Sequence, residues 1–288
     1  METLPVLAGN TPSAYEQQAL REIQLWKNPS MGWFGKAVDG LNRKLHSATD
    51  LIRKVPGVDW TIENVVSGLL RVMNEIVQDS VWHEAIYKEF HAAGHAIDSA
   101  EDLINLDLEQ IDGVMKGLDT KYRALTATQG AAAGYAGAAG ILPDVVGLVA
   151  LNLRACGEYA TYCGYDIAHP SERLFALQIL NMVSQPTDTA KQAALVPTIR
   201  VSHAIARQQT LQTVEQMALT QAIRNAARAL GVHLTQRKLA QVVPMTGAFV
   251  GGGFNAYYTS KVCDAAFFLY RERWLIEKYG VDVLEFED

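Results

Sequence analysis

The 288-residue sequence predicts an all-α protein, a single-domain bundle of about eight to ten helices. Apolar residues recur at the three- and four-residue spacing of a helix, as at Val65, Leu69, Val72 and Ile76. The sequence has no run of alternating apolar and polar residues, which is the pattern of a half-buried strand. The turns between helical stretches are short and none is rich in Pro, Gly or Ser, so no linker to a second domain is indicated.

Capping residues and helix breakers divide the first half of the chain. Ser13 suits an N-cap, and Asn28-Pro29 ends the first helix because a proline disfavours helical backbone in the residue before it. Ser99 suits a later helix start, with Asp102 three residues on as its capping partner. The helices expected in this half are residues 13–26, 33–55, 61–95, one that opens at residue 99, and 108–140.

Proline and glycine give the boundaries in the second half. Pro143 and Pro170 suit the first turn of a helix, where the backbone N–H needs no partner within the helix. Gly164 suits the position after a helix end, and Pro197 predicts a kink. The helices expected here are residues 143–164, 170–185, 187–230, 235–243 and 244–280, which places the helical domain at 13–280 and leaves an acidic, frayed tail at 281–288.

Charge and cysteine content exclude several function classes. The chain has 25 basic and 31 acidic residues, and this net charge of −6 argues against nucleic acid as a partner, because phosphate backbones are bound through Lys and Arg. The three cysteines form no C-x-x-C pair, so neither a disulfide framework nor a zinc knuckle is indicated. Residues 1–10 lack the pattern of a signal peptide, and we therefore expect a cytoplasmic protein.

Two stretches are apolar, glycine-rich and nearly free of charge. The first, at 130–154, reads GAAAGYAGAAGILPDVVGLVALNLR, and Asp144 is its only charge before the final arginine. The second, at 239–261, reads LAQVVPMTGAFVGGGFNAYYTSK and has no charge before its final lysine. Helices without side chains on one face can approach each other to backbone contact. The glycines expected at such close contacts are Gly130, Gly134, Gly137, Gly251, Gly252 and Gly253.

Each stretch has the length of about 20 apolar residues that a helix needs to cross a bilayer. Pro143-Asp144 interrupts the first one, and a carboxylate at the bilayer centre costs about 2.5–3.5 kcal/mol. Three interpretations stay open at this point: a transmembrane span, a hairpin that associates reversibly with a membrane, and a buried hairpin of a soluble fold.

The sequence contains no Gly-x-Ser-x-Gly elbow, Walker loop or EF-hand loop. Asp144 lies among apolar residues, so it needs a partner if it is buried, unless it complements the dipole at the start of its helix. Arg154 and Glu158 lie four residues apart, as do Arg273 and Glu277, and each couple can pair along a helix. The residues expected in a ligand-binding or structural polar cluster are Asp144, Arg154, Glu158, Asp166, Arg173, Asn255, Lys261, Arg273 and Glu277.

His91 and His95 form the best candidate for a metal site. They lie four residues apart within the predicted helix 61–95, the spacing of the zinc-protease helix, and zinc or iron would be the expected ion. The glutamate that acts as base in that motif is replaced by Ala92. A polar, solvated helix face explains the same residues, and otherwise no cofactor is expected.

Three segments carry a resemblance to a known family. They are the stretch at 130–154, CGYDIAHPSERLFALQIL at 163–180, and VPMTGAFVGGGFNAYYTSKVCDAAFFLYRERWLIEKYG at 243–280. This ordered set resembles the EcsC family of bacterial proteins over residues 15–280. Cys163 departs from the tyrosine or other bulky residue expected before the Gly-Tyr-Asp turn.

The resemblance implies a helical, non-catalytic accessory protein near a membrane. The family takes its name from an operon whose other members encode an ABC transporter, and its own biochemical activity is unassigned. A membrane surface or a membrane transporter is the implied partner, with a location in the cytoplasm or on the inner face of the membrane; a homo-oligomer stays open. Two alternatives from other classes also stay open: a helical hydrolase that uses the His91/His95 helix, and a carrier of an apolar ligand held between the glycine-rich hairpins.

Overall fold

The computed structural model describes residues 11–28, 63–72, 83–135, 140–185, 188–206, 221, 223–232, 234–235 and 247–285. All regular structure in these ranges is helical, which confirms the predicted all-α class. The elements with defined bounds are α1 (Ala14–Lys27), α4 (His83–Ala92), η1 (Glu101–Asn105), α5 (Leu108–Met115), α6 (Leu118–Tyr135), α7 (Ile141–Tyr162), α8 (Pro170–Ser184), α9 (Asp188–Ala206), α11 (Gly247–Tyr279) and η3 (Val281–Glu285).

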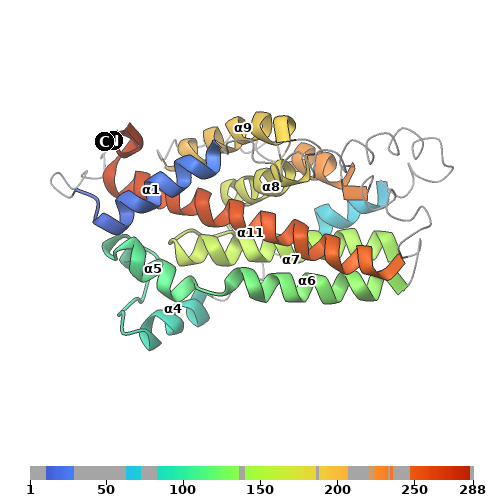
Figure 1. The fold of residues 1–288 in the computed structure, drawn as a ribbon, viewed down its shortest axis with the longest axis horizontal. Helices are drawn as coiled ribbons and strands as arrows, with labels where there is room; N and C mark the ends of the chain where they lie inside the picture. The colour runs from blue at the N-terminus through green and yellow to red at the C-terminus, as the bar shows by residue number, and fades with distance from the viewer. Residues whose placement is uncertain are drawn as a thin grey trace.

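Helix α11, with 33 residues, runs along the length of the molecule (Figure 1). It contacts α1, α6, α7, α8 and α9, and its longest contact is with α6. The carboxyl end of α6, the amino end of α7 and the amino end of α11 lie at the same end of the bundle. Helices α1 and α5 and the end of the chain lie at the opposite end.

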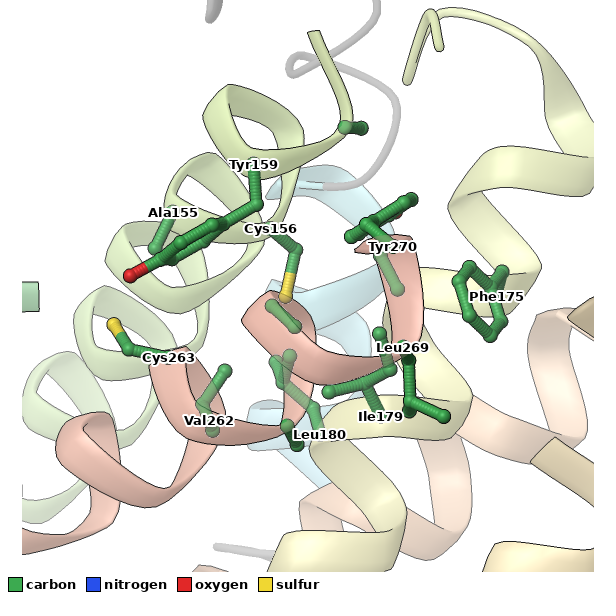
Figure 2. Packing of buried hydrophobic residues seen from close by; sticks show 14 of the residues in the cluster. Ala155, Cys156, Tyr159, Phe175, Ile179, Leu180, Val262, Cys263, Leu269 and Tyr270 are labelled. Atoms are coloured by element: carbon green, nitrogen blue, oxygen red, sulfur yellow. The ribbon is translucent and has the colours of Figure 1, made fainter. Parts of the chain in front are cut away.

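The core lies between α7, α8 and α11. Figure 2 shows side chains of all three helices meeting there, among them Cys156 from α7, Phe175 from α8 and Tyr270 from α11. The Tyr270 ring meets the Phe175 ring edge-on at 5.1 Å between centroids. All three cysteines are free and buried, as expected of small apolar packing residues, and burial raises the pKa of Cys263 to about 12.

Several predicted boundaries are confirmed by the local chemistry. Ser13 and Glu16 form a complete capping box at the start of α1. Pro170 occupies the first turn of α8, and Pro197 lies inside α9. Gly164 follows α7 with a φ of 88°, a left-handed conformation that glycine adopts without strain.

Two predicted helices are shorter than expected because a glycine with positive φ ends each of them. The predicted helix 108–140 is divided into α5 and α6 at Gly117, whose φ is 89°. Within the predicted helix 61–95, the helical segments 63–72 and α4 are described, and α4 ends at Ala92, before Gly94 with a φ of 92°; residues 61–62 and 73–82 lie outside the described part. Apolar periodicity continues across both breaks, so the hydrophobic pattern alone did not reveal them.

Two further expectations need correction. The element after Ser99 is the short 3₁₀ helix η1, although Asp102 does accept a hydrogen bond from the Ser99 N–H at 2.9 Å. The tail is not frayed throughout, because residues 281–285 form η3 and Val283 is only 2% exposed. The predicted helices 33–55 and 235–243, the start of 244–280 and the middle of 187–230 lie outside the described residues, apart from residue 235.

Two glycines outside the predicted set lie close to neighbouring helices. A Cβ added to Gly147 would lie 2.5 Å from Nε2 of Gln129, and one on Gly68 would lie 2.7 Å from Cγ2 of Val146. Among the predicted glycines, Gly130 is buried on α6 and Gly134 is half-buried. Gly253 is exposed, and a Cβ there would meet no atom within 4 Å, so its predicted packing role is wrong. Gly137 and the surroundings of Gly251 and Gly252 lie outside the described part.

These contacts predict opposite effects for two glycine-to-alanine substitutions on long helices. Gly253→Ala should raise the free energy of unfolding by up to about 1 kcal/mol, because alanine favours an exposed helix and meets no neighbour. Gly147→Ala should leave the protein about 1–3 kcal/mol less stable than Gly253→Ala, because Gln129 must move and lose its hydrogen bond to the Asp144 carbonyl. Urea unfolding of both variants measures the difference, and equal stabilities would contradict the packing described here.

Candidate functional site

The polar residues that the sequence singled out form three separate groups along the bundle. Asp144 and Asn255 meet at the glycine-rich end, Arg154 and Glu158 pair farther along α7, and Arg273 and Glu277 lie in the second half of α11. Asp166, Arg173 and Lys261 contribute to none of these ion pairs. The three groups are best understood separately.

Asp144 is the centre of the first group. Its carboxylate is 5% exposed and accepts a hydrogen bond of 2.8 Å from Nδ2 of Asn255 on α11. Gln129 on α6 donates to the Asp144 backbone carbonyl at 2.9 Å, and Thr126 donates to the Asn255 carbonyl at 3.4 Å. Asp144 also lies in the first turn of α7, where the helix dipole favours a negative charge. This group therefore fastens α6, α7 and α11 together.

The parts of α6, α7 and α11 around Asp144 are defined as the neutral end, residues 124–135, 141–153 and 247–260. The helical segment 63–72, with its exposed Glu63 and Arg71, also packs against α7 here and is not part of the neutral end. Asp144 is the only Asp, Glu, Lys or Arg in the neutral end, and it is buried. Leu125 on α6 and Tyr257 on α11 are instead 46% and 48% exposed. The neutral end thus places apolar side chains at the surface and its single charge inside.

Glu158 is the centre of the second group. Its carboxylate accepts hydrogen bonds from Lys121 at 2.6 Å and from the Tyr122 hydroxyl at 2.7 Å, and Nε of Arg154 lies 3.6 Å away. Burial, with the Glu158 charge beside it, raises the pKa of Tyr122 well above its usual value, so this phenol remains a donor. Two hydrogen-bond donors and the nearby Arg154 cation explain how this carboxylate can be buried between α6 and α7.

Arg273 is the centre of the third group. Its guanidinium lies 2.6 Å from Glu172 on α8 and 3.3 Å from Glu277 one turn along α11, and it covers the Tyr165 ring at 3.7 Å from the centroid. Burial raises the pKa of Glu172 and of Glu277, while the charge of Arg273 opposes that effect. Glu172 was not among the predicted residues, and only its place in the fold reveals the pair.

Further buried ion pairs join α11 to α1 and α5. Glu16 is fully buried and accepts from Lys278 at 3.2 Å and from the Tyr279 hydroxyl at 2.6 Å. Arg271 pairs with Asp112 at 2.9 Å. These ion pairs hold α1 and α5 against α11, so we assign them to the architecture.

Asp166 borders a hollow of about 250 Å³ at the surface. Its carboxylate lies 3.5 Å from Nε2 of His83, and the other lining residues are Tyr87, Ala100, Thr161, Gly164 and Tyr165. Lys261 pairs with Asp264 at 2.9 Å on the surface. Burial lowers the pKa of the half-buried Arg173.

The two histidines of the predicted metal site do not share a helix face, because α4 ends before His95. His91 lies 3.3 Å from Asp98, whereas His95 lies 3.5 Å from Gln110 and packs against the Phe90 ring. Within the described ranges, no group of three or more His, Cys, Asp or Glu side chains is arranged to hold a metal ion. Binding of zinc or iron at this pair stays a prediction, which elemental analysis of the dialysed protein tests.

Removal of the Asn255 amide should destabilise the fold. Asn255→Ala leaves the buried Asp144 carboxylate without its 2.8 Å donor, and the free energy of unfolding should fall by about 1–3 kcal/mol. Ala256→Ser, at a half-buried neighbouring position on the same helix, should change stability by less than about 0.5 kcal/mol. An Asn255→Ala variant as stable as this control in urea unfolding would show that the contact contributes nothing.

Asp112 should give a distinct pH dependence. Burial raises the pKa of this carboxyl to about 6, from an ordinary value of 3.8, although Arg271 opposes the shift. Protonation therefore favours the folded state: the contribution is complete below about pH 4 and is lost as the pH rises through 6. As the pH falls from 7.5 to 4.5, the free energy of unfolding of the wild type should increase relative to that of Asp112→Asn, and urea unfolding measures this difference. A constant difference would contradict the raised pKa, and Asp264→Asn, at an exposed ion pair, is the control.

Comparison with known proteins assigns the family. The family model described as "EcsC protein family" matches residues 17–275. The chain is 22% identical over 278 residues to the "Uncharacterized protein YdbA" of Bacillus subtilis (strain 168), a match that covers 91% of this chain and 93% of that protein. No solved structure matches the chain significantly. The match covers nearly the whole chain and, of the polar residues in the groups and ion pairs above, leaves out Glu16, Glu277, Lys278 and Tyr279. Because it spans well over half of the chain, this protein belongs to the EcsC protein family.

Proposed function

We propose that this EcsC-family protein is a non-catalytic accessory protein that docks reversibly, by its neutral end, on the surface of a lipid bilayer. The observation that supports the proposal is the division of charge along the bundle. Ion pairs surround the second half of α11, whereas the neutral end has a single charge, and that charge is buried.

The exposed side chains of the neutral end suit a bilayer surface. Leu125 offers an apolar side chain, and Tyr257 combines a ring with a hydroxyl, a residue type enriched at membrane interfaces. Docking would bury apolar area at about 25 cal/mol per Å² without removing the hydration of a charged group. Ala132 and Gly253 are also exposed there, and neither carries a polar side chain.

The mode of attachment we propose is peripheral. No helix within the described ranges is both long and apolar enough to cross a bilayer. In α6 and α7 the uncharged stretch is divided between two antiparallel helices, and Asp144, in the first turn of α7, accepts a hydrogen bond from Asn255 on α11. A protein docked in this way would reach a transporter by diffusion along the bilayer. The operon association of the family suggests a transporter as the partner.

The alternative functions receive less support from the contacts. A carrier needs an apolar cavity lined by glycine and alanine, but the hollow beside Asp166 is lined mainly by aromatic and polar residues. A hydrolase using His91 and His95 needs both rings on one side of a helix, and these rings contact different partners. The membrane interpretation is therefore the one that we carry forward.

The proposal predicts binding to vesicles that depends on two exposed residues. Wild-type protein should float with phosphatidylcholine vesicles, and the double substitution Leu125→Glu/Tyr257→Glu should weaken partitioning at least about tenfold, because each new carboxylate must be desolvated. Anionic lipid should change binding little, since the net charge of −6 gives no general attraction to it.

The matched control is Leu25→Glu/Val196→Glu, which adds the same charge at positions 72% and 51% exposed on α1 and α9. Both variants must first show wild-type circular dichroism and melting. Val146 is unsuitable for this test because it packs against Gly68, so that a charge there would disturb folding. Wild-type protein that floats with neither neutral nor anionic vesicles would refute the proposal, as would equal loss of binding in the control.

A further inference from the structure

The boundary of the neutral end is marked by the same order of charges on all three helices. The first charged residue beyond it is Arg123 on α6, Arg154 on α7 and Lys261 on α11. We call these three residues the basic belt. Their side chains are 51%, 50% and 49% exposed, so each cationic group reaches solvent while part of its stem is covered.

Each cation of the belt has an acidic partner farther from the neutral end on its own helix. Arg123 lies 3.8 Å from Asp119, Arg154 lies 3.6 Å from Glu158, and Lys261 lies 2.9 Å from Asp264. On each of the three helices, an uncharged segment is therefore followed, with increasing distance from the neutral end, by a basic residue and then by its acidic partner.

Helix chemistry alone does not produce this order. An acid placed before a base along the chain stabilises a helix better than the reverse, and α6 follows that preference with Asp119 before Arg123. Helices α7 and α11 reverse it, with Arg154 before Glu158 and Lys261 before Asp264. Since α6 runs toward the neutral end and the other two run away from it, the charge order follows position in the molecule and not chain direction.

Contacts between the helices place the three cations at one level of the bundle. Asn152 donates to the Thr259 hydroxyl at 3.0 Å, and these residues each lie two positions before a belt cation, Arg154 and Lys261. Tyr122, next to Arg123 in sequence, donates to Glu158, the partner of Arg154. The basic belt therefore surrounds part of α6, α7 and α11 at the level where the neutral end begins.

We infer that the basic belt contacts the phosphate groups of lipids at the rim of the docked neutral end and sets how deeply that end enters the bilayer. The inference rests on the proposed function. Long basic side chains can lie along an apolar surface while their charged groups reach the phosphate layer. Asp119 and Asp264 stay in water farther from the neutral end, whereas Glu158 stays buried with its other donors, Lys121 and Tyr122. A lipid phosphate then becomes a partner of each belt cation.

The experiment compares two triple variants that lose the same three positive charges. The belt variant is Arg123→Gln/Arg154→Gln/Lys261→Gln, and the control is Arg21→Gln/Lys88→Gln/Arg200→Gln, at exposed positions on α1, α4 and α9. Both carry a polarity-sensitive fluorophore on Thr128→Cys, an exposed position within the neutral end, while the native cysteines are buried. Phosphatidylcholine vesicles with quenchers at different depths report affinity and depth together.

The belt variant should bind these vesicles about tenfold more weakly and hold the fluorophore nearer the surface, whereas the control should stay within about twofold of the wild type in affinity. Circular dichroism and melting establish that both variants are folded. If the wild type binds and the belt variant matches it in affinity and depth, the belt inference is overturned while the docking proposal stands. If the wild type does not bind at all, both are overturned. Loss of self-association in the belt variant, without any effect on vesicle binding, would assign the belt to contact with a second copy of the chain and would also overturn the inference.

Discussion

Helix α11 imposes the constraint on which the rest of the structure depends. Most side chains in its second half are buried, and these include the charged Arg271 and Arg273. A buried charge without a partner is strongly unfavourable, so α1, α5 and α8 must each bring an acidic side chain to this helix. The ion pairs thereby decide which elements lie beside α11, while the apolar core shown in Figure 2 supplies the general driving force for burial.

The start of α11, residues 247–260, imposes the opposite constraint, because it has no charged residue. It packs against α6 and α7 with few polar contacts, among them those of Asn255 with Asp144 and of Thr259 with Asn152. A single hydrogen-bonded carboxylate in such surroundings favours one arrangement of the three helices over sliding alternatives, since any shift in register breaks the bond. Helices α6, α7 and α11 are therefore rich in ion pairs at one end and, apart from Asp144, uncharged at the other, and this difference along the three helices is the feature from which both functional proposals start.

Much of the helical framework was predictable because local chemistry determines it. Ser13 caps α1, Pro170 opens α8 and Gly164 ends α7 through interactions within a few residues of each position. The breaks at Gly94 and Gly117 escaped prediction, since an isolated glycine within apolar helical periodicity does not distinguish an interruption from a continuous helix. The glycine clusters also suggested close packing at Gly253, yet that position is exposed, because composition does not say which side of a helix meets a neighbour.

The sequence by itself determined the all-α class, the family, the principal caps and the two uncharged stretches, because these depend on residue type and short-range spacing. Only the tertiary structure decided how charges are paired. Asp144 accepts a hydrogen bond from the amide of Asn255, which lies 111 residues away in the chain, and Arg273 pairs with Glu172 across about a hundred residues as well as with its helical neighbour Glu277. The tertiary structure also aligned the ends of α6, α7 and α11, which turned separate uncharged stretches into one surface. Such pairings are decided by which helix faces meet, a property of packing that residue spacing within one helix does not contain.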